Sequence, residues 1–302
     1  MSYRLERLRR TALWSAARRM RQAAPVNWLA TVPLRALVGA RWEWAIRHLP
    51  RAGRVRARLP NGSTLVLCSK GDDWVSNQVF WRGWSGYEPE TAPLFLRLAA
   101  RSRVTLDVGA HVGFYALLAG LANPAGRVFA FEPMPLAMER LRRHVALNRL
   151  ANVEGIPCAA DDRDGEADLH FPRGNPLPCS AGLSGEFYTP WAEAMDRTRV
   201  SCVTLDAFVR ERRLDGVDLV KIDVEGTEAA VLRGACDTLE RFRPDIVCEV
   251  LAGTYGGLDE LLRPLGYSFY VLTSDGLVRQ ERPEPDPRFM NHLFSTRPIG
   301  DL

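Results

Sequence analysis

From Glu90 onward, short apolar runs alternate with amphipathic stretches. The apolar runs predict seven strands at 103–108, 127–131, 153–157, 218–222, 245–249, 267–272 and 290–296. The stretches between them predict helices at 91–100, 113–122, 135–148, 227–242 and 256–265. This alternation is typical of a doubly wound α/β sheet, in which ligands bind at the carboxyl ends of the central strands.

The first 90 residues have a different pattern. Two Trp-containing segments, 4–22 and 27–48, are expected to be helical. Apolar positions on either side of Asn61-Gly62 predict a β-hairpin. The aromatic-rich stretch 71–90 is expected to form an irregular cap. We therefore expect a basic helical extension over 1–52, a hairpin and cap over 53–90, and the α/β domain over 91–298.

Composition narrows the class of protein. The chain has 302 residues, 46% hydrophobic and 25% charged, which is typical of a globular protein and not of a disordered one. Its six cysteines show no Cys-x-x-Cys spacing, so neither a disulfide framework nor a zinc site is indicated. No apolar run approaches the roughly 20 residues of a membrane span, and the N-terminus does not resemble a signal peptide. A cytoplasmic protein is expected.

The net charge of +4 is unevenly distributed. Residues 1–58 contain 14 Arg and two acids, or +12, which leaves 4 − 12 = −8 for the remainder. An Arg-rich helix at 4–22 could make peripheral contact with an anionic membrane, although a solvated helix is the simpler reading. Nucleic acid is not expected as a partner, because aromatic residues do not alternate with the arginines. The sequence gives no indication of the oligomeric state.

The most informative motif is Asp107-x-Gly109-x-x-x-Gly113, which joins the strand at 103–108 to the next helix. Glycines allow a ligand to approach the turn, and the start of a helix offers unpaired N–H groups. Dinucleotide-binding loops usually begin with Gly where this loop has Asp107, and an acid would repel a diphosphate. The motif therefore favours the cationic cofactor S-adenosylmethionine.

Acids also follow the next two strands. Glu132 ends the strand at 127–131, beside Asp107 in a parallel sheet, and could accept hydrogen bonds from both ribose hydroxyls. Asp161 follows the strand at 153–157 and could accept a hydrogen bond from the adenine amino group, although it could equally belong to a surface turn.

A dense group of charges follows the fourth strand, in Lys221-Ile-Asp223-Val-Glu225-Gly-Thr-Glu228. Lys221 and Asp223 project to the same side of a strand, so we expect the reaction here. Glu228 falls in a first helical turn, where an acid is favoured by the helix dipole alone. Glu249 ends the neighbouring strand and could be either a partner of Lys221 or an active-site acid.

These motifs resemble those of FkbM-type methyltransferases. The resemblance spans about residues 86–296, and Lys221–Gly226 is its most specific part. It implies a class I S-adenosylmethionine-dependent methyltransferase with a Rossmann-like sheet of seven strands, the last antiparallel. It also implies cofactor contacts at Asp107, Gly109, Glu132 and Asp161, and a hydroxyl acceptor on a secondary metabolite, sugar or glycolipid. His111 departs from the usual Asn, which leaves its contact with the cofactor open.

A hydroxyl acceptor must lose its proton as the methyl group is transferred. Asp223 is the first candidate for the general base and Glu225 the second. Asp223 could instead bind Mg²⁺, which would lower the pKa of the hydroxyl. The Asn/Asp-Pro-Pro-Tyr/Phe motif of amino-group methylation is absent after the fourth strand, which favours oxygen. The alternatives are a nicotinamide-dependent oxidoreductase, or a non-catalytic membrane-associated protein that keeps the fold.

Overall fold

The computed structural model describes residues 27, 29, 31–35, 46, 48–174, 177–178, 180–184, 194–253, 255–298 and 300. The chain divides into two compact units, residues 1–87 and 88–302. The Arg-rich helix expected at 4–22 lies outside the described residues, so its contact with a membrane stays a prediction. Among the described residues, no helix combines the length and the apolar composition that a membrane crossing requires.

The first unit contains the expected hairpin. Strand β1 (Ala52–Arg58) pairs antiparallel with β2 (Thr64–Lys70), and Val55 lies opposite Leu67. The turn uses Gly62 at φ 85°, a conformation that glycine adopts without strain. Val55 and Ala57 of β1 are buried, and the arginines at 54, 56 and 58 are exposed, as the pattern predicts.

The segment 71–90 is more regular than expected, because it contains helix α4 (Trp74–Arg82). The Asp73 carboxylate caps this helix by accepting a hydrogen bond from the Val75 N–H at 2.9 Å. Gly83, at φ 91°, ends it. The expectation of an irregular cap was wrong, because the many aromatic residues hid a helix with an ordinary N-cap.

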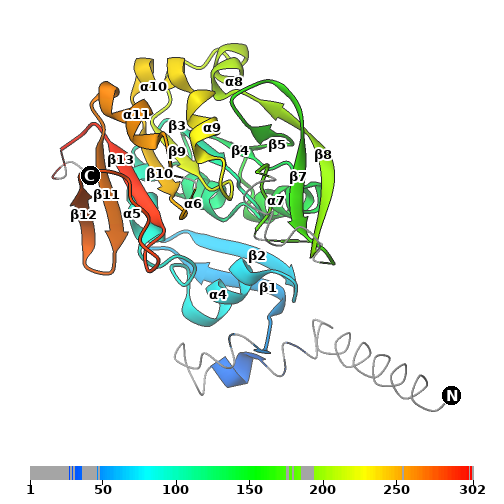
Figure 1. The fold of residues 1–302 in the computed structure, drawn as a ribbon. Coiled ribbons are helices and arrows are strands. Elements are labelled where there is room, and N and C mark those ends of the chain that lie inside the picture. The colour runs from blue at the N-terminus through cyan, green and yellow to red at the C-terminus, as the bar shows by residue number, and fades with distance from the viewer. Residues whose placement is uncertain are drawn as a thin grey trace. The chain divides into compact units, whose positions relative to one another are not determined.

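The second unit is built on a large mixed sheet (Figure 1). Within the described residues its strand order is β12-β11-β13-β10-β9-β3-β4-β5. The bounds are β3 Val104–Val108, β4 Arg127–Phe131, β5 Val153–Ile156, β9 Leu219–Ile222, β10 Asp245–Glu249, β11 Ser268–Thr273, β12 Gly276–Gln280 and β13 Asn291–Ser295. Strands β5, β4, β3, β9 and β10 are parallel, and β13 pairs antiparallel with β10 and β11. The predicted doubly wound sheet is confirmed.

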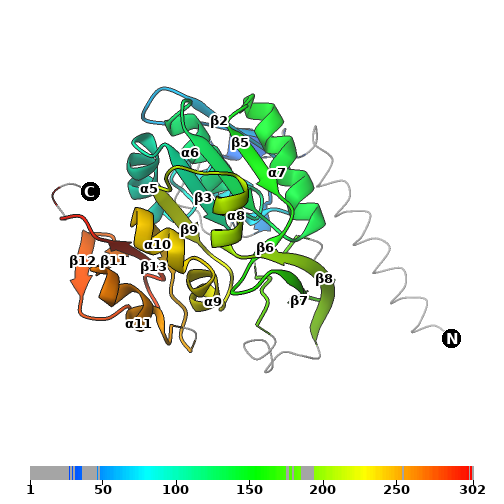
Figure 2. The ribbon, with the colours of Figure 1, turned by 90° about the horizontal axis from the view of Figure 1, so that it is seen from above.

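Helices cover both faces of this sheet (Figure 2). One face carries α5 (Thr91–Ala100), α6 (Phe114–Ala122) and α7 (Pro135–Asn148). The other carries α8 (Leu205–Glu211), α9 (Glu228–Arg233), α10 (Cys236–Phe242) and α11 (Leu258–Leu262), which a 3₁₀ turn at Arg263–Leu265 follows. Every residue of β3, β9, β10 and β13 is buried, as expected of strands covered on both sides.

The structure adds elements that the hydrophobic pattern did not predict. β12 extends the sheet from seven strands to eight, and its residues are exposed or half-buried, so it lacks a strong apolar signal. A separate three-stranded sheet contains β6 (Ala159–Ala160), β8 (Met195–Val203) and β7 (Gly165–Pro172). The single helix expected at 227–242 is interrupted at Gly234, where a Cβ would overlap the Asp161 carbonyl oxygen.

Candidate functional site

The glycine loop after β3 is held against the protein's own backbone. Gly109 and Gly113 have φ values of 81° and 87°, and His111 has 48°. A Cβ at Gly109 would overlap the carbonyl oxygen of Asp223, and one at Gly113 would lie 2.8 Å from the Leu141 side chain. The glycines are therefore required by packing and by backbone conformation, which are reasons beyond the ligand approach inferred from the sequence.

Asp107 is buried at the end of this loop's strand, with 1% of its surface exposed. It lies beside Lys221 in the pairing of β3 with β9. Burial raises the pKa of Asp107 to about 7, although the positive charge of Lys221 opposes the shift. Its Oδ2 atom has no hydrogen-bond donor among the described residues. A buried acceptor of this kind is suited to a ligand that carries an N–H group.

Glu132, which follows β4, accepts two backbone hydrogen bonds, one of them from the glycine loop. Its Oε2 accepts a hydrogen bond from the His111 N–H and its Oε1 one from the Met134 N–H, both at 2.7 Å. Burial raises the pKa of Glu132 to about 7; the two hydrogen bonds oppose this shift, and the nearby Asp107 adds to it. The structure therefore gives Glu132 a role that the sequence did not reveal, which is to hold the glycine loop. Each oxygen keeps a second lone pair that a ribose hydroxyl could use.

Asp161 lies next to a different sheet from the glycine loop. It follows β6, and its N–H donates to the Val203 carbonyl at 3.1 Å. The residue is half-buried, and its carbonyl packs against Gly234 after α9. Its contact with adenine, like that of the His111 ring with the cofactor, stays a prediction.

Lys221 is the most deeply buried charge of the site, with 0% exposure. Its Nζ donates to Asp223 Oδ2 at 3.1 Å and lies 5.2 Å from the centre of the Tyr115 ring. Burial alone would lower the pKa of Lys221, but the carboxylates of Asp223, Glu88 and Glu249 raise it above its ordinary value. The positively charged form of Lys221 is therefore favoured, and its ammonium holds one oxygen of Asp223.

Glu88 was not among the residues expected at the site. Its Oε2 accepts hydrogen bonds from the Tyr115 hydroxyl at 2.5 Å and from Asn291 Nδ2 at 2.9 Å. The Glu88 backbone adopts φ 46°. Tyr115 and Asn291 lie within the stretch 86–296 that resembles the family, but no role was expected of either residue. Glu88 precedes the first helix of the α/β domain, and the aromatic pattern around it gave no signal of chemistry.

Three further carboxylates, those of Glu225, Glu228 and Glu249, lie near the ion pair of Lys221 with Asp223. Burial and then the charges of Asp223 and Glu228 raise the pKa of Glu225 to about 8. The pKa of Glu249 is raised by burial, and next by the charges of Asp223 and Glu225. Glu228 has a structural role, because its Oε1 accepts a hydrogen bond from the Gly226 N–H at 3.0 Å.

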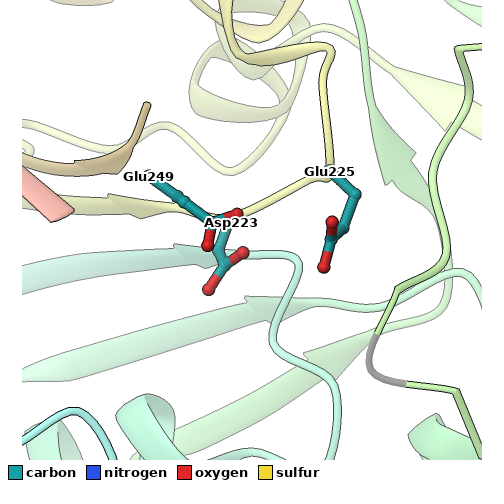
Figure 3. A group of neighbouring side chains, drawn as sticks. All are labelled: Asp223, Glu225 and Glu249. Carbon is teal, nitrogen blue, oxygen red and sulfur yellow. The ribbon is translucent and has the colours of Figure 1, made fainter. Parts of the chain in front are cut away.

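Asp223, Glu225 and Glu249 could together hold a metal ion. Each offers a carboxylate oxygen, and these oxygens lie within 4.8 Å of one another. Figure 3 shows Glu249 and Asp223 with adjacent carboxylates, while the Glu225 side chain extends from the loop after β9 to one side of them. The structure thus brings Lys221, Asp223 and Glu225, the catalytic residues expected from the sequence, close together, and it places Glu249, whose role the sequence left open, beside them.

The segment between β7 and β8 also reaches this group. Gly182 pairs with His170 in an isolated bridge. A Cβ on Gly182 would lie 2.8 Å from the Glu225 carbonyl oxygen and 2.9 Å from that of Val224. Gly182 therefore borders the loop that carries Asp223 and Glu225.

Comparison with known proteins decides the family. Residues 107–269 match the model of the methyltransferase FkbM domain. "31-O-demethyl-FK506 methyltransferase FkbM" of Streptomyces tacrolimicus is 30% identical over 240 residues, which cover 70% of this chain and 88% of the relative. The chain belongs to the FkbM methyltransferase family. "2-O-methyltransferase NoeI" of Sinorhizobium fredii is 31% identical over 149 residues, 46% of this chain and 60% of that protein.

A solved FkbM methyltransferase from Methylobacillus flagellatus is 19% identical with a TM-score of 0.40, over 64% of this chain and 43% of that one. The strand order described above, with its antiparallel β13, is the class I methyltransferase sheet that the family resemblance implies. As a member of this family the protein is a methyltransferase. The oxidoreductase alternative is therefore set aside.

Proposed function

We propose that this FkbM-family methyltransferase transfers a methyl group from S-adenosylmethionine to a hydroxyl oxygen of a small molecule. The observation that carries the proposal is the contact between Gly109 and the Asp223 carbonyl. It joins the glycine loop, where we expect the cofactor, to the loop after β9, where we expect the reaction. This contact places the glycine loop beside the carboxylates after β9. The relatives from Streptomyces tacrolimicus and Sinorhizobium fredii bear names of oxygen methylation, which supports the same chemistry here.

The charges of the site fit this cofactor. Asp107 Oδ2 is a buried acceptor without a donor among the described residues, and it suits the ammonium group of S-adenosylmethionine. Asp223 and Glu88 add further negative charge around Asp107, and Lys221 opposes it. Such a site favours a sulfonium cation and repels the diphosphate of a dinucleotide.

We assign the cofactor contacts as the sequence predicts. The loop from Asp107 through Gly109 and His111 to Gly113 would hold the amino acid part of the cofactor. Glu132 would accept from the ribose hydroxyls through the lone pairs that the backbone N–H groups leave. Asp161 would accept from the adenine amino group.

When bound, the cofactor supplies a methyl group whose S–C bond breaks as the O–C bond to the acceptor forms. The chain's own part is to position the hydroxyl and to accept its proton. Asp223 suits this task, because Lys221 fixes one of its oxygens while 22% of the side chain remains exposed. Glu225 is the second candidate for the base. Asp223 could instead coordinate Mg²⁺, which would lower the pKa of a bound hydroxyl.

Two observations bear on the acceptor: the family to which the chain belongs, and the segment that lies next to the loop carrying Asp223 and Glu225. We propose a hydroxyl on a secondary metabolite, a sugar or a glycolipid. Gly182 lies against the Val224-Glu225 backbone, so we propose that the segment around it contacts such an acceptor.

The test is a product analysis with candidate acceptors. The purified full chain is incubated with S-adenosylmethionine that carries a deuterated methyl group and with a panel of hydroxylated metabolites, sugars and glycolipids. The proposal predicts a labelled methyl ether on at least one acceptor. Label found on nitrogen or carbon instead would contradict it.

A further inference from the structure

The oxygens of Asp223, Glu225 and Glu249 form a compact group of ligands. They lie within 4.8 Å of one another, at the ends of β9 and β10 (Figure 3). Ligands on opposite sides of an octahedral Mg²⁺ are about 4.2 Å apart, because each ligand lies at about 2.1 Å from the ion. A short inward movement of the side chains would therefore bring all three oxygens into coordination distance.

A second observation points to a missing partner. Glu249 is 9% exposed, and its Oε2 has no hydrogen-bond donor among the described residues. Asn291 lies directly opposite Glu249 in the pairing of β10 with β13 and is 8% exposed. The Asn291 amide donates to Glu88, while its Oδ1 has no donor in the described part of the chain. Two buried acceptor oxygens on neighbouring strands thus call for a donor or a cation.

The nearby ammonium group does not meet this need. Lys221 Nζ donates to Asp223 Oδ2, and one positive charge faces the carboxylates of Asp223, Glu88 and Glu249. The ligand group contains only carboxylate oxygens, so it offers no thiolate or imidazole. Oxygen donors of this kind favour hard divalent cations over zinc or copper.

We propose that Asp223, Glu225 and Glu249 bind one hard divalent cation, and that Asn291, which pairs with Glu249 across β10 and β13, supplies a further oxygen donor. The role of the cation rests on the proposed function: it would hold the acceptor hydroxyl next to the glycine loop. The site itself requires neither cofactor nor acceptor. Its occupancy can therefore be measured on the protein alone.

Mn²⁺ is a suitable probe, because it prefers the same oxygen ligands as Mg²⁺ and the free ion is detected by electron paramagnetic resonance. The full chain is stripped with a chelator, dialysed and titrated with Mn²⁺. The expected result is one saturable site per chain. Glu249→Gln and Glu225→Gln should each weaken binding at least tenfold, whereas the exposed Glu240→Gln should bind as the wild type does.

S-Adenosylhomocysteine binding is measured on the same preparations as an independent check of folding. The proposal is overturned if no saturable Mn²⁺ site exists below about 1 mM, or if both glutamate substitutions leave a saturable site unchanged. A wild-type chain that binds S-adenosylhomocysteine normally but does not bind Mn²⁺ would refute the metal site alone. Mn²⁺ binding without S-adenosylhomocysteine binding would refute the proposed function alone.

Discussion

The carboxylates at the carboxyl ends of the central strands lie in two different environments. We call the carboxyl ends of β3 and β4 the β3–β4 edge, and those of β9 and β10 the β9–β10 edge. At the β3–β4 edge, Glu132 is surrounded by backbone N–H groups, and both of its oxygens accept hydrogen bonds. At the β9–β10 edge, Glu249 and Glu225 face other carboxylates and share the single ammonium of Lys221. The fold itself thus supplies donors to Glu132, whereas the β9–β10 edge is left with an excess of negative charge.

This difference distinguishes a carboxylate that stabilises the fold from carboxylates that are available to a ligand or a proton. A carboxylate that accepts backbone hydrogen bonds stabilises its loop whether or not a ligand is present. Carboxylates held against one another raise the free energy of the empty site, and a cation or a proton relieves that repulsion. We therefore expect substitutions of the carboxylates at the β9–β10 edge to affect turnover, and substitution of Glu132 to affect both the fold and cofactor binding.

The largest effect is expected for Lys221→Met, which removes the buried cation and leaves its carboxylates uncompensated. We expect the free energy of unfolding to fall by about 3–5 kcal/mol, together with loss of turnover. Urea denaturation measures the first. Arg173→Met is the matched control, because its ion pair with Asp196 is exposed and should contribute under about 1 kcal/mol. Equal losses in the two variants would show that Lys221 has no special role.

Asp223→Asn is expected to lower turnover by roughly 10²–10⁴-fold, because the amide cannot accept the hydroxyl proton. Affinity for S-adenosylhomocysteine should stay within a few-fold, since the Asp223 side chain is assigned to the acceptor hydroxyl and the cofactor contacts are assigned to other residues. Initial rates and calorimetry on the same preparation check both. Unchanged turnover would remove Asp223 from the role of base.

A third experiment uses pH to compare the two edges. The pKa of Glu132 is about 7 in the folded protein, against an ordinary 4.5. The folded state therefore binds this proton more tightly, so the stability it contributes is complete below pH 4.5 and is lost as the pH rises through about 7. The loss amounts to roughly 3 kcal/mol.

Glu132→Gln should lack this part of the pH dependence when unfolding is measured at pH values on both sides of the window. Glu139→Gln, an exposed change on α7, should keep the wild-type slope. Glu132→Gln should also weaken cofactor binding by roughly 1–3 kcal/mol. A wild-type slope in Glu132→Gln would show that the carboxyl titrates normally.

The smallest effect is expected at Asp161. If its carboxylate accepts from the adenine amino group, Asp161→Asn should weaken S-adenosylhomocysteine binding by about 1 kcal/mol, roughly fivefold. Asp162→Asn is the neighbouring control on the same loop, and it should bind as the wild type does. Equal affinities in the two variants would place Asp161 outside the adenine site.

The sequence predicted the central sheet well, because β3, β4, β9 and β10 are short apolar runs that end in acids at the ligand edge. It also predicted that Lys221 and Asp223 would act together, since residues two apart on a strand share a face. The edge strand β12 escaped prediction because strands that are partly solvated carry little apolar signal.

Other features depend on contacts between residues distant in the chain. Glu88 joins the site through Tyr115 and Asn291, which lie 27 and 203 positions away. Nothing in the local pattern around Glu88 could indicate these partners. The backbone hydrogen bonds to Glu132 were hidden for the same reason, because a loop conformation decides which N–H groups reach a carboxylate.

The most direct test of the account is a calorimetric titration of the full chain with S-adenosylhomocysteine and, separately, with NAD. A pocket built around the buried Asp107 carboxylate predicts saturable binding of S-adenosylhomocysteine, no binding of NAD, and an affinity at least about fivefold weaker in Asp107→Asn. Binding of NAD in place of S-adenosylhomocysteine, or an Asp107→Asn variant that binds as tightly as the wild type, would contradict it.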